Sequence, residues 1–153
     1  MNSLELKIPP VVVGAVIALL MWLLARSFPA FAFTVEPMPI AAAGVALAGV
    51  AITGLAALSF RKAHTTVNPM KPSSTSSLVT SGIYRYTRNP MYLGFFLALI
   101  AWGLHLSNGL ALLALPAFIL YMNRFQIEPE ERALTALFGQ EFAQYTSQVR
   151  RWL

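Results

Sequence analysis

The sequence lacks cysteine and is poor in charge. Its 153 residues include no Cys and two His, and Asp, Glu, Lys and Arg together make up 11% of the chain. Without cysteine there is no disulfide, no thiolate nucleophile and no cysteine-ligated metal. His64 and His105 are too few and too widely separated to predict a metal centre. We therefore expect no metal site. Because the charged fraction is about half that of an average soluble domain, we also expect a membrane protein.

The sequence also lacks the signatures of common soluble active sites. It contains no dinucleotide-binding glycine motif, no phosphate-binding loop, no paired-histidine helix motif and no serine elbow. No linker-like stretch separates two apolar halves, so residues 1–153 are expected to form one domain. The basic residues behind the net charge of +5 lie between and after the apolar runs. This distribution favours contact with membrane lipid and argues against a nucleic-acid partner.

Long uncharged runs predict an all-α, polytopic membrane protein. Ile8 to Ala25 and Ile40 to Phe60 carry no charge, and as helices they measure about 27 and 31 Å, enough to cross a bilayer. A cleaved signal peptide is the alternative for the first run, but "ARSFPAFAF" is a poor cleavage site.

A third uncharged run, from Asn89 to Asn123, is too long for one span because a single helix would reach about 50 Å. The turn signal "HLSNG" at 105–109 divides it into a short hairpin. The four predicted transmembrane helices therefore cover about 8–26, 40–60, 90–106 and 110–123, and Pro116 is expected to kink the last.

The basic residues predict the orientation of these spans. They concentrate in the loop between the second and third spans and after the fourth, and both regions are therefore expected in the cytoplasm. With four spans, the N- and C-termini are then both cytoplasmic. The residues concerned are Arg61, Lys62, Lys71, Arg85 and Arg88 in the loop, and Arg124, Arg132, Arg150 and Arg151 after the last span.

Residues 124–153 are predicted to leave the bilayer as cytoplasmic amphipathic helices. Gly139 is expected to end a first helix before a second begins. The apolar face either lies on the membrane surface or closes a cavity that faces the cytoplasm. Its members recur at a spacing of three to four, and they are Leu134, Leu137, Phe138, Phe142, Tyr145 and Val149.

The stretch "YRYTRNPMYLG" (84–94) begins the predicted hairpin at the cytoplasmic face. Asn89 and Pro90 match the N-cap and the first position of a helix, and the positive end of that helix would also attract a carboxylate. Arg85 and Arg88, with the neighbouring tyrosines, either anchor the protein to lipid headgroups or line a ligand site.

An acidic cluster at Glu128, Glu130 and Glu131 follows the predicted hairpin. These carboxylates either favour the start of the next helix, with Pro129 at its first position, or supply anions to a ligand site. The hairpin returns the chain to the face that carries Arg85 and Arg88, so we expect the acidic and basic groups to meet.

Together these stretches resemble the isoprenylcysteine carboxyl methyltransferase group and its bacterial and phospholipid-methylating relatives. The resemblance rests on "SLVTSGIYRYTRNPMYLG" (77–94), a membrane hairpin and "PEERALTALFGQEFAQY" (129–145), about the C-terminal half of the chain. The first two spans resemble the family only in being hydrophobic. The resemblance implies an integral membrane enzyme that binds S-adenosylmethionine without a Rossmann domain and methylates a lipophilic small molecule.

The same resemblance implies a set of site residues. The cofactor is expected between the loop before the hairpin and the cytoplasmic C-terminal segment. Glu130 is the expected contact to its polar groups, and Arg124 and Glu131 are the expected catalytic residues. The other implied cofactor-binding residues are Ser77, Leu78, Val79, Tyr84, Arg88, Asn89, Pro90 and Tyr92.

Two positions depart from the eukaryotic members. Those members have His before the Pro, whereas this chain has Asn89, which donates hydrogen bonds but cannot carry a cation. They also have an Arg shortly before the acidic pair that orients an acceptor carboxylate; Gln126 stands there, and Arg124 is the nearest cation. The second departure argues against a prenylcysteine carboxylate as substrate. An amine or alcohol acceptor needs a base, for which Glu131 and Tyr92 are candidates.

Two other functions stay open at this stage. A membrane reductase of the steroid-reductase type has a related Arg-His-Pro-x-Tyr segment, but this chain has Met91 and lacks the extra spans expected for a nicotinamide site. A non-catalytic, lipid-binding membrane protein would use the same Arg and Tyr residues as anchors. The residues alone identify neither the acceptor nor the oligomeric state.

Overall fold

The computed structural model describes residues 4–36, 38–63 and 76–153. His64 and Lys71, which entered the predictions of metal binding and orientation, lie outside these residues. Within the described part every regular element is helical, apart from one isolated bridge between Ala32 and Asn108. The elements are α1 (Pro10–Ser27), η1 (Pro29–Phe31), α2 (Met38–Lys62), η3 (Gly82–Arg85), α3 (Pro90–Leu106), α4 (Gly109–Leu112), α5 (Leu115–Tyr121), η4 (Met122–Ile127), α6 (Glu128–Phe138) and α7 (Gln140–Gln148).

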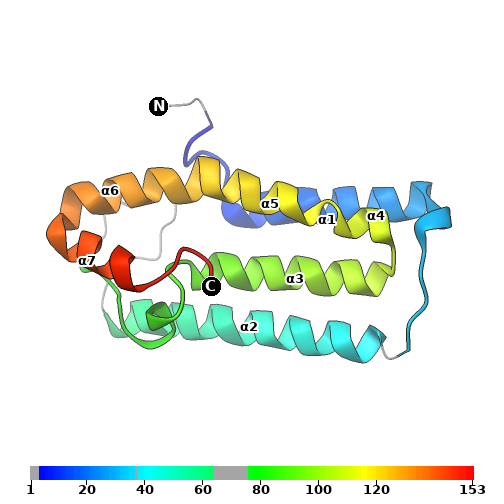
Figure 1. Cartoon of the computed structure of the whole chain (residues 1–153), viewed down its shortest axis with the longest axis horizontal. Helices are drawn as coiled ribbons and strands as arrows, with labels where there is room; N and C mark the ends of the chain where they lie inside the picture. The colour runs from blue at the N-terminus through cyan, green and yellow to red at the C-terminus, as the bar shows by residue number, and fades with distance from the viewer. Residues whose placement is uncertain (1–3, 37, 64–75) are drawn as a thin grey trace.

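The long helices run side by side in alternating directions (Figure 1). α3 contacts α2 on one side and α1, α4 and α5 on the other. The chain from α4 to α6 forms one long rod, and α7 folds back from its end toward the start of α3 (Figure 1). The predicted all-α class is therefore confirmed. The beginning of α1, the end of α2, the beginning of α3 and the α6–α7 region meet at one end of the bundle.

Among the described residues, three stretches are long and apolar enough to cross a membrane, namely Pro10–Ser27, Met38–Lys62 and Gly109–Phe138. The third predicted span corresponds to α3, which is apolar but has 17 residues. Its bounds coincide with the predicted 90–106. The count of four spans, and the cytoplasmic position of α6 and α7, stay predictions.

The helix predicted over 110–123 does not end at Asn123, because the helical chain continues into α6. It does so through η4, a π-helical segment. Pro129 has no amide hydrogen, and its ring crowds the carbonyl four residues earlier, that of Phe125. That carbonyl instead accepts a hydrogen bond of 3.0 Å from the amide of Leu6. The wider π-helical turn and the N-terminal segment thus let the helix pass a proline without an unpaired carbonyl.

The hairpin between α3 and α4 turns at Ser107 and Asn108, as "HLSNG" predicts. The Asn108 carboxamide oxygen accepts hydrogen bonds from the amides of Leu110 and Ala111, and its nitrogen donates to the carbonyl of Phe28 at 2.9 Å. Pro116 was predicted to kink the helix. The helix is instead interrupted at residues 113–114, between α4 and α5 and just before Pro116 in the first turn of α5.

Two glycines set the distance between α2 and α3. A Cβ atom on Gly94 would collide with the hydroxyl oxygen of Thr53 and would lie 2.8 Å from the carbonyl oxygen of Gly49. A Cβ atom on Gly49 would lie 2.9 Å from the carbonyl oxygen of Gly94. Such mutual small residues allow helix backbones to approach closely within lipid. This contact fixes the start of α3, which borders the candidate site, against the middle of α2.

Candidate functional site

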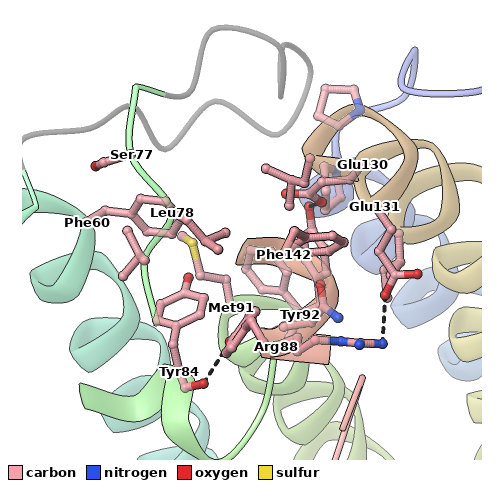
Figure 2. Close-up of a pocket in the computed structure, with 18 of the residues that line it drawn as sticks. Phe60, Ser77, Leu78, Tyr84, Arg88, Met91, Tyr92, Glu130, Glu131 and Phe142 are labelled. Carbon is pink, nitrogen blue, oxygen red and sulfur yellow. Dashed lines mark hydrogen bonds and ion pairs between the residues drawn. The ribbon is translucent and has the colours of Figure 1, made fainter. Parts of the chain in front are cut away.

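A cavity of about 220 Å³ lies at the end of the bundle where α1, α2, α3, α6 and α7 meet. Phe60, Leu78 and Tyr84 are on one side of the cavity, and Glu130 and Glu131 of α6 are on the other (Figure 2). The volume is many times the roughly 10–15 Å³ that one water needs. Most of the lining is apolar, with a small number of polar groups, which is the usual composition of a small-molecule site.

The structure brings most of the residues predicted for the site together around this cavity. Pro90 does not line it but is buried at the first position of α3. Arg124 also lies outside the cavity lining; its guanidinium pairs with Glu128 at 2.9 Å, and its side chain is 53% exposed. The predicted residues that line the cavity are Ser77, Leu78, Val79, Tyr84, Arg88, Asn89, Tyr92, Glu130 and Glu131.

Glu130 faces the cavity through a chain of hydrogen bonds. The Tyr92 hydroxyl donates to the Glu130 carboxylate at 3.0 Å, and the Gln126 side-chain nitrogen donates to the Tyr92 hydroxyl at 3.2 Å. Glu130 forms no ion pair with any residue that the structure describes. A carboxylate in a largely apolar cavity is stabilised by a cationic group. The position of Glu130 therefore suits a ligand that carries positive charge.

Glu131, the next residue, has a different environment. One oxygen accepts from Arg88 at 2.9 Å and from Nε of Arg151 at 3.2 Å, and the other accepts from Nη2 of Arg151 at 2.6 Å. The hydrogen bond to Glu131 raises the pKa of Arg151 above its ordinary value. Charge-assisted pairs of this kind hold planar groups in fixed orientation. Two neighbouring carboxylates thus have separate surroundings, one bound by two arginines and one directed into the cavity.

Arg88 has one polar atom without a partner in the described structure. Its Nη1 donates to the carbonyl of Thr146 at 3.3 Å and its Nη2 to Glu131, whereas its buried Nε has none. A buried donor without an acceptor is costly. Arg88 lines the cavity, and its Nε is a donor that the described residues leave without an acceptor.

Asn89 occupies the predicted N-cap position of α3, but it does not cap the helix with its side chain. Its side-chain nitrogen donates to the carbonyl of Arg151 at 2.9 Å, while its amide donates to the Thr87 hydroxyl at 3.2 Å. The expected capping bond is therefore replaced by a tertiary contact. The sequence carries no local sign of this, because the partner lies 62 positions away.

Two buried phenols form part of the same wall. The Tyr145 hydroxyl donates to the backbone carbonyl of Tyr84 at 2.7 Å and so joins α7 to η3. Burial, followed by the nearby charge of Glu130, raises the pKa of Tyr84 well above its ordinary value. Burial also raises the pKa of Tyr145, against the opposing effect of Arg88. Both phenols are therefore neutral at physiological pH and act as hydrogen-bonding and apolar surfaces.

Sequence reasoning did not assign several other lining residues to the site. Leu134, Phe142 and Tyr145 belong to the predicted amphipathic face, which was expected either on the membrane surface or over a cavity. Nothing in the sequence indicated that the start of α1 borders the site, because this stretch has the composition of a membrane span. The residues concerned are Pro9, Pro10 and Val11. The remaining unassigned lining residues are Phe60, Met91, Phe95 and Ile127.

Comparisons with known proteins relate this chain to membrane methyltransferases. An uncharacterized protein of Haemophilus influenzae is 51% identical over 63 residues, which cover 41% of this chain and 100% of that protein. Human protein-S-isoprenylcysteine O-methyltransferase is 34% identical over 77 residues, 50% of this chain and 27% of the human protein. The enzyme of that name from Saccharomyces cerevisiae is 37% identical over 82 residues, 52% of this chain and 33% of the yeast protein.

The matched region thus spans a third or less of these two named methyltransferases. No solved structure is significantly similar to the chain. The sequence model of the phospholipid methyltransferase family matches residues 37–141, which include α2, the hairpin, α6 and most of the described cavity lining. The chain belongs to the phospholipid methyltransferase family.

Proposed function

We propose that this protein is an S-adenosylmethionine-dependent methyltransferase that acts on a lipophilic small molecule delivered by the membrane. The observation that carries the proposal is the cavity itself. Its two principal walls, residues 77–95 and 127–134, lie within the stretch that matches the family. They combine a large apolar surface with the carboxylate of Glu130 and the unpaired Nε donor of Arg88.

The residues of the cavity fit the cofactor by their chemistry. S-adenosylmethionine, when bound, supplies a methyl group on a sulfonium and also carries an ammonium, a carboxylate and an aromatic base. Glu130 suits the cationic groups, and Arg88 suits a carboxylate. Phe142 and Tyr145 offer aromatic surface for the base. Ser77, Leu78 and Val79 would close the opposite wall.

The apolar walls can contribute to methyl transfer by excluding water. A methyl transfer from a sulfonium disperses positive charge in the transition state, and a dry site avoids solvating the cation that reacts. Leu78, Met91 and Phe95 place apolar side chains around the cavity, and Leu134 adds one from α6. Holding donor and acceptor in contact distance supplies a further share of the acceleration.

The protonation requirement depends on the acceptor. A carboxylate acceptor needs no base, whereas an amine or alcohol loses a proton. Glu131, the predicted catalytic carboxylate, has both oxygens occupied by hydrogen bonds from Arg88 and Arg151. We therefore assign proton acceptance to Glu130, which contacts only neutral groups among the described residues, with Tyr92 as its hydrogen-bonded partner. Arg124, outside the cavity lining, stays a predicted acceptor-orienting cation.

The acceptor is proposed to reach the cavity from the lipid side. Pro9, Pro10 and Val11 of the first span form part of the lining, and Val11 is 60% exposed on the bundle surface. Gln126, where the resembling eukaryotic enzymes have Arg, is buried and bonded to Tyr92. The site therefore offers no guanidinium at this position for a carboxylate acceptor.

Calorimetric titration of S-adenosylmethionine into detergent-purified protein tests the first part of the proposal. We expect saturable binding that Glu130→Gln weakens by about tenfold or more, because a charge-assisted contact is lost. Glu141→Gln is the matched control, since Glu141 lies on exposed α7 surface outside the cavity. Absence of binding by the folded wild-type protein would refute the proposed function.

Transfer of labelled methyl groups to a lipid extract tests the second part. Extracts of bacterial or eukaryotic membranes are incubated with the protein and methyl-labelled S-adenosylmethionine, and the organic phase is separated and counted. We expect a labelled lipophilic product with wild type and with Glu141→Gln, and little with Glu130→Gln. Absence of any labelled product, together with lipid-dependent oxidation of NADPH in a parallel assay, would favour a reductase instead.

A further inference from the structure

Residues Arg150–Trp152, which we name the clasp, lie against the segment before α3. The amide of Arg88 donates to the carbonyl of Arg150 at 3.0 Å. The carbonyl of Arg151 accepts from the side-chain nitrogen of Asn89 at 2.9 Å and from the Thr87 hydroxyl at 3.4 Å. Three consecutive residues before α3 are therefore tied to two consecutive residues of the clasp.

The side chain of Arg151 extends the clasp to α6. It binds both oxygens of Glu131, at 2.6 and 3.2 Å, and Arg88 binds the same carboxylate at 2.9 Å. A two-point guanidinium–carboxylate contact fixes orientation more strongly than a single bond. Arg151 thus joins the two walls of the cavity, the segment before α3 and the first turn of α6, although it does not line the cavity itself.

Trp152 anchors the clasp on a third element. Its indole nitrogen donates to the side-chain oxygen of Asn123 at 2.9 Å, and its ring lies 6.3 Å from that of Phe96. Because Asn123 belongs to η4 and Phe96 to α3, the clasp is held in place independently of Arg151. Replacing the Arg151 side chain therefore tests its contact with Glu131 while the clasp backbone stays anchored.

We propose that Arg151 is a positioning residue for the cofactor site and acts through Glu131. This inference rests on the proposed function, and it concerns a residue outside the stretch 37–141 that matches the family. Glu131 directly follows Glu130 on α6 and also pairs with Arg88. The two hydrogen bonds from Arg151 to Glu131 fix the helical turn that presents Glu130 to the cavity. They also keep Arg88 at the edge of the cavity.

The decisive comparison is Arg151→Gln against Arg150→Gln. Both changes remove one positive charge, but the Arg150 side chain is exposed and only its carbonyl takes part in the clasp. We expect Arg151→Gln to weaken S-adenosylmethionine binding about tenfold, within the range of coupling through a contact network, and Arg150→Gln to change it less than twofold. Calorimetry gives the affinities, and thermal unfolding without cofactor shows that both variants are folded.

A double-mutant cycle separates positioning from a general loss of stability. If Arg151 acts through Glu131, Arg151→Gln adds little to the effect of Glu131→Gln, because the shared contact is already lost. Fully additive effects would overturn the inference. Arg151→Lys, which keeps the charge but loses the two-point contact, should bind several-fold more weakly than wild type and serves if Arg151→Gln does not fold.

The possible results distinguish this inference from the proposed function. Wild-type protein that binds no S-adenosylmethionine refutes the function and the inference together. Wild-type binding that Arg151→Gln and Arg151→Lys leave unchanged refutes the inference alone. Equal losses in Arg151→Gln and Arg150→Gln would mean that only net charge matters, which also overturns it.

Discussion

The hydroxyl of Tyr92 donates a hydrogen bond of 3.0 Å to the carboxylate of Glu130, across 38 positions of sequence. Tyr92 lies in the first turns of α3, and Glu130 lies in the first turn of α6. The bond therefore links the two walls of the cavity from within. The side-chain nitrogen of Gln126 donates to the same hydroxyl at 3.2 Å, so the phenol both accepts and donates. This arrangement orients the Glu130 carboxyl group without an ion pair among the described residues.

Replacing Tyr92 by Phe tests that link. We expect Tyr92→Phe to weaken S-adenosylmethionine binding by several-fold and to reduce the free energy of unfolding by about 1–2 kcal/mol, because Glu130 and Gln126 each lose a buried partner. Calorimetry and denaturant unfolding in detergent measure the two effects. Tyr86→Phe is the control, since Tyr86 is 72% exposed. Equal affinities for Tyr92→Phe and wild type would exclude Tyr92 from orienting Glu130.

Much of the fold and the core of the site could be predicted from sequence. The uncharged runs indicated α1, α2 and α3, and the turn signal around Asn108 indicated the hairpin that brings Tyr92 near Glu130. These features follow from local composition, because apolar length and turn residues act within a few positions. The motif resemblance then selected the residues of the two walls.

The features that sequence reasoning missed depend on contacts between distant residues. The helix continues beyond Asn123 because Leu6 binds the carbonyl of Phe125, which the proline at 129 would otherwise leave unpaired. The side chain of Asn89 leaves its helix for the carbonyl of Arg151. Neither partner has a sequence signature, since one is a backbone amide and the other a backbone carbonyl. Arg151 itself looks like any basic residue at a membrane surface.

The close approach of α2 and α3 predicts that Gly94 tolerates no side chain. We expect Gly94→Ala to lower the free energy of unfolding by about 1–3 kcal/mol, because the new methyl group overlaps Thr53 and lies near the carbonyl of Gly49. Thr53→Ala should restore part of the loss in the double variant by removing one of these obstacles. Unfolding in mixed micelles of increasing denaturing detergent measures the change.

Gly44→Ala provides the matched control for this contact. Gly44 is also on α2, but beyond its own helical turn no atom of the described residues lies within 4 Å of the position that its Cβ would occupy. Because alanine favours a helix over glycine, we expect a gain of roughly 0.5–1 kcal/mol. A Gly94→Ala protein as stable as the Gly44→Ala protein would show that the helices are not in close contact.

Asn108 is expected to fix the hairpin through three hydrogen bonds made by one side chain. Asn108→Ala removes the cap of α4 and leaves the carbonyl of Phe28 without its donor, so we expect a loss of about 2–3 kcal/mol. Asn108→Asp keeps the acceptor for the two amides but removes the donor, and it introduces a buried charge. Unfolding experiments should therefore find Asn108→Asp no more stable than Asn108→Ala. A smaller loss for Asp than for Ala would mean that capping alone matters.

The orientation across the membrane can be measured directly because the native sequence has no cysteine. A single cysteine at Thr34 would lie in the connection between α1 and α2, and one at Ser147 would lie on α7, at opposite ends of the bundle (Figure 1). Both positions are exposed. The distribution of basic residues predicts that Thr34 faces away from the cytoplasm and Ser147 faces it. In intact cells, a membrane-impermeant maleimide should label Thr34→Cys and leave Ser147→Cys unlabelled until the membrane is opened.

The same labelling decides whether α3 acts as a full span. α3 has 17 residues, about 26 Å of helix, which is shorter than a hydrocarbon core of roughly 30 Å and reaches the far surface only if the bilayer thins. If the hairpin turn crosses to the outer side, a cysteine at Ser107 should label from outside together with Thr34→Cys. Labelling of Ser107→Cys only after the membrane is opened would contradict four complete spans. A hairpin inserted from the cytoplasmic side would then replace the last two spans, with the cavity and its two walls still on that side.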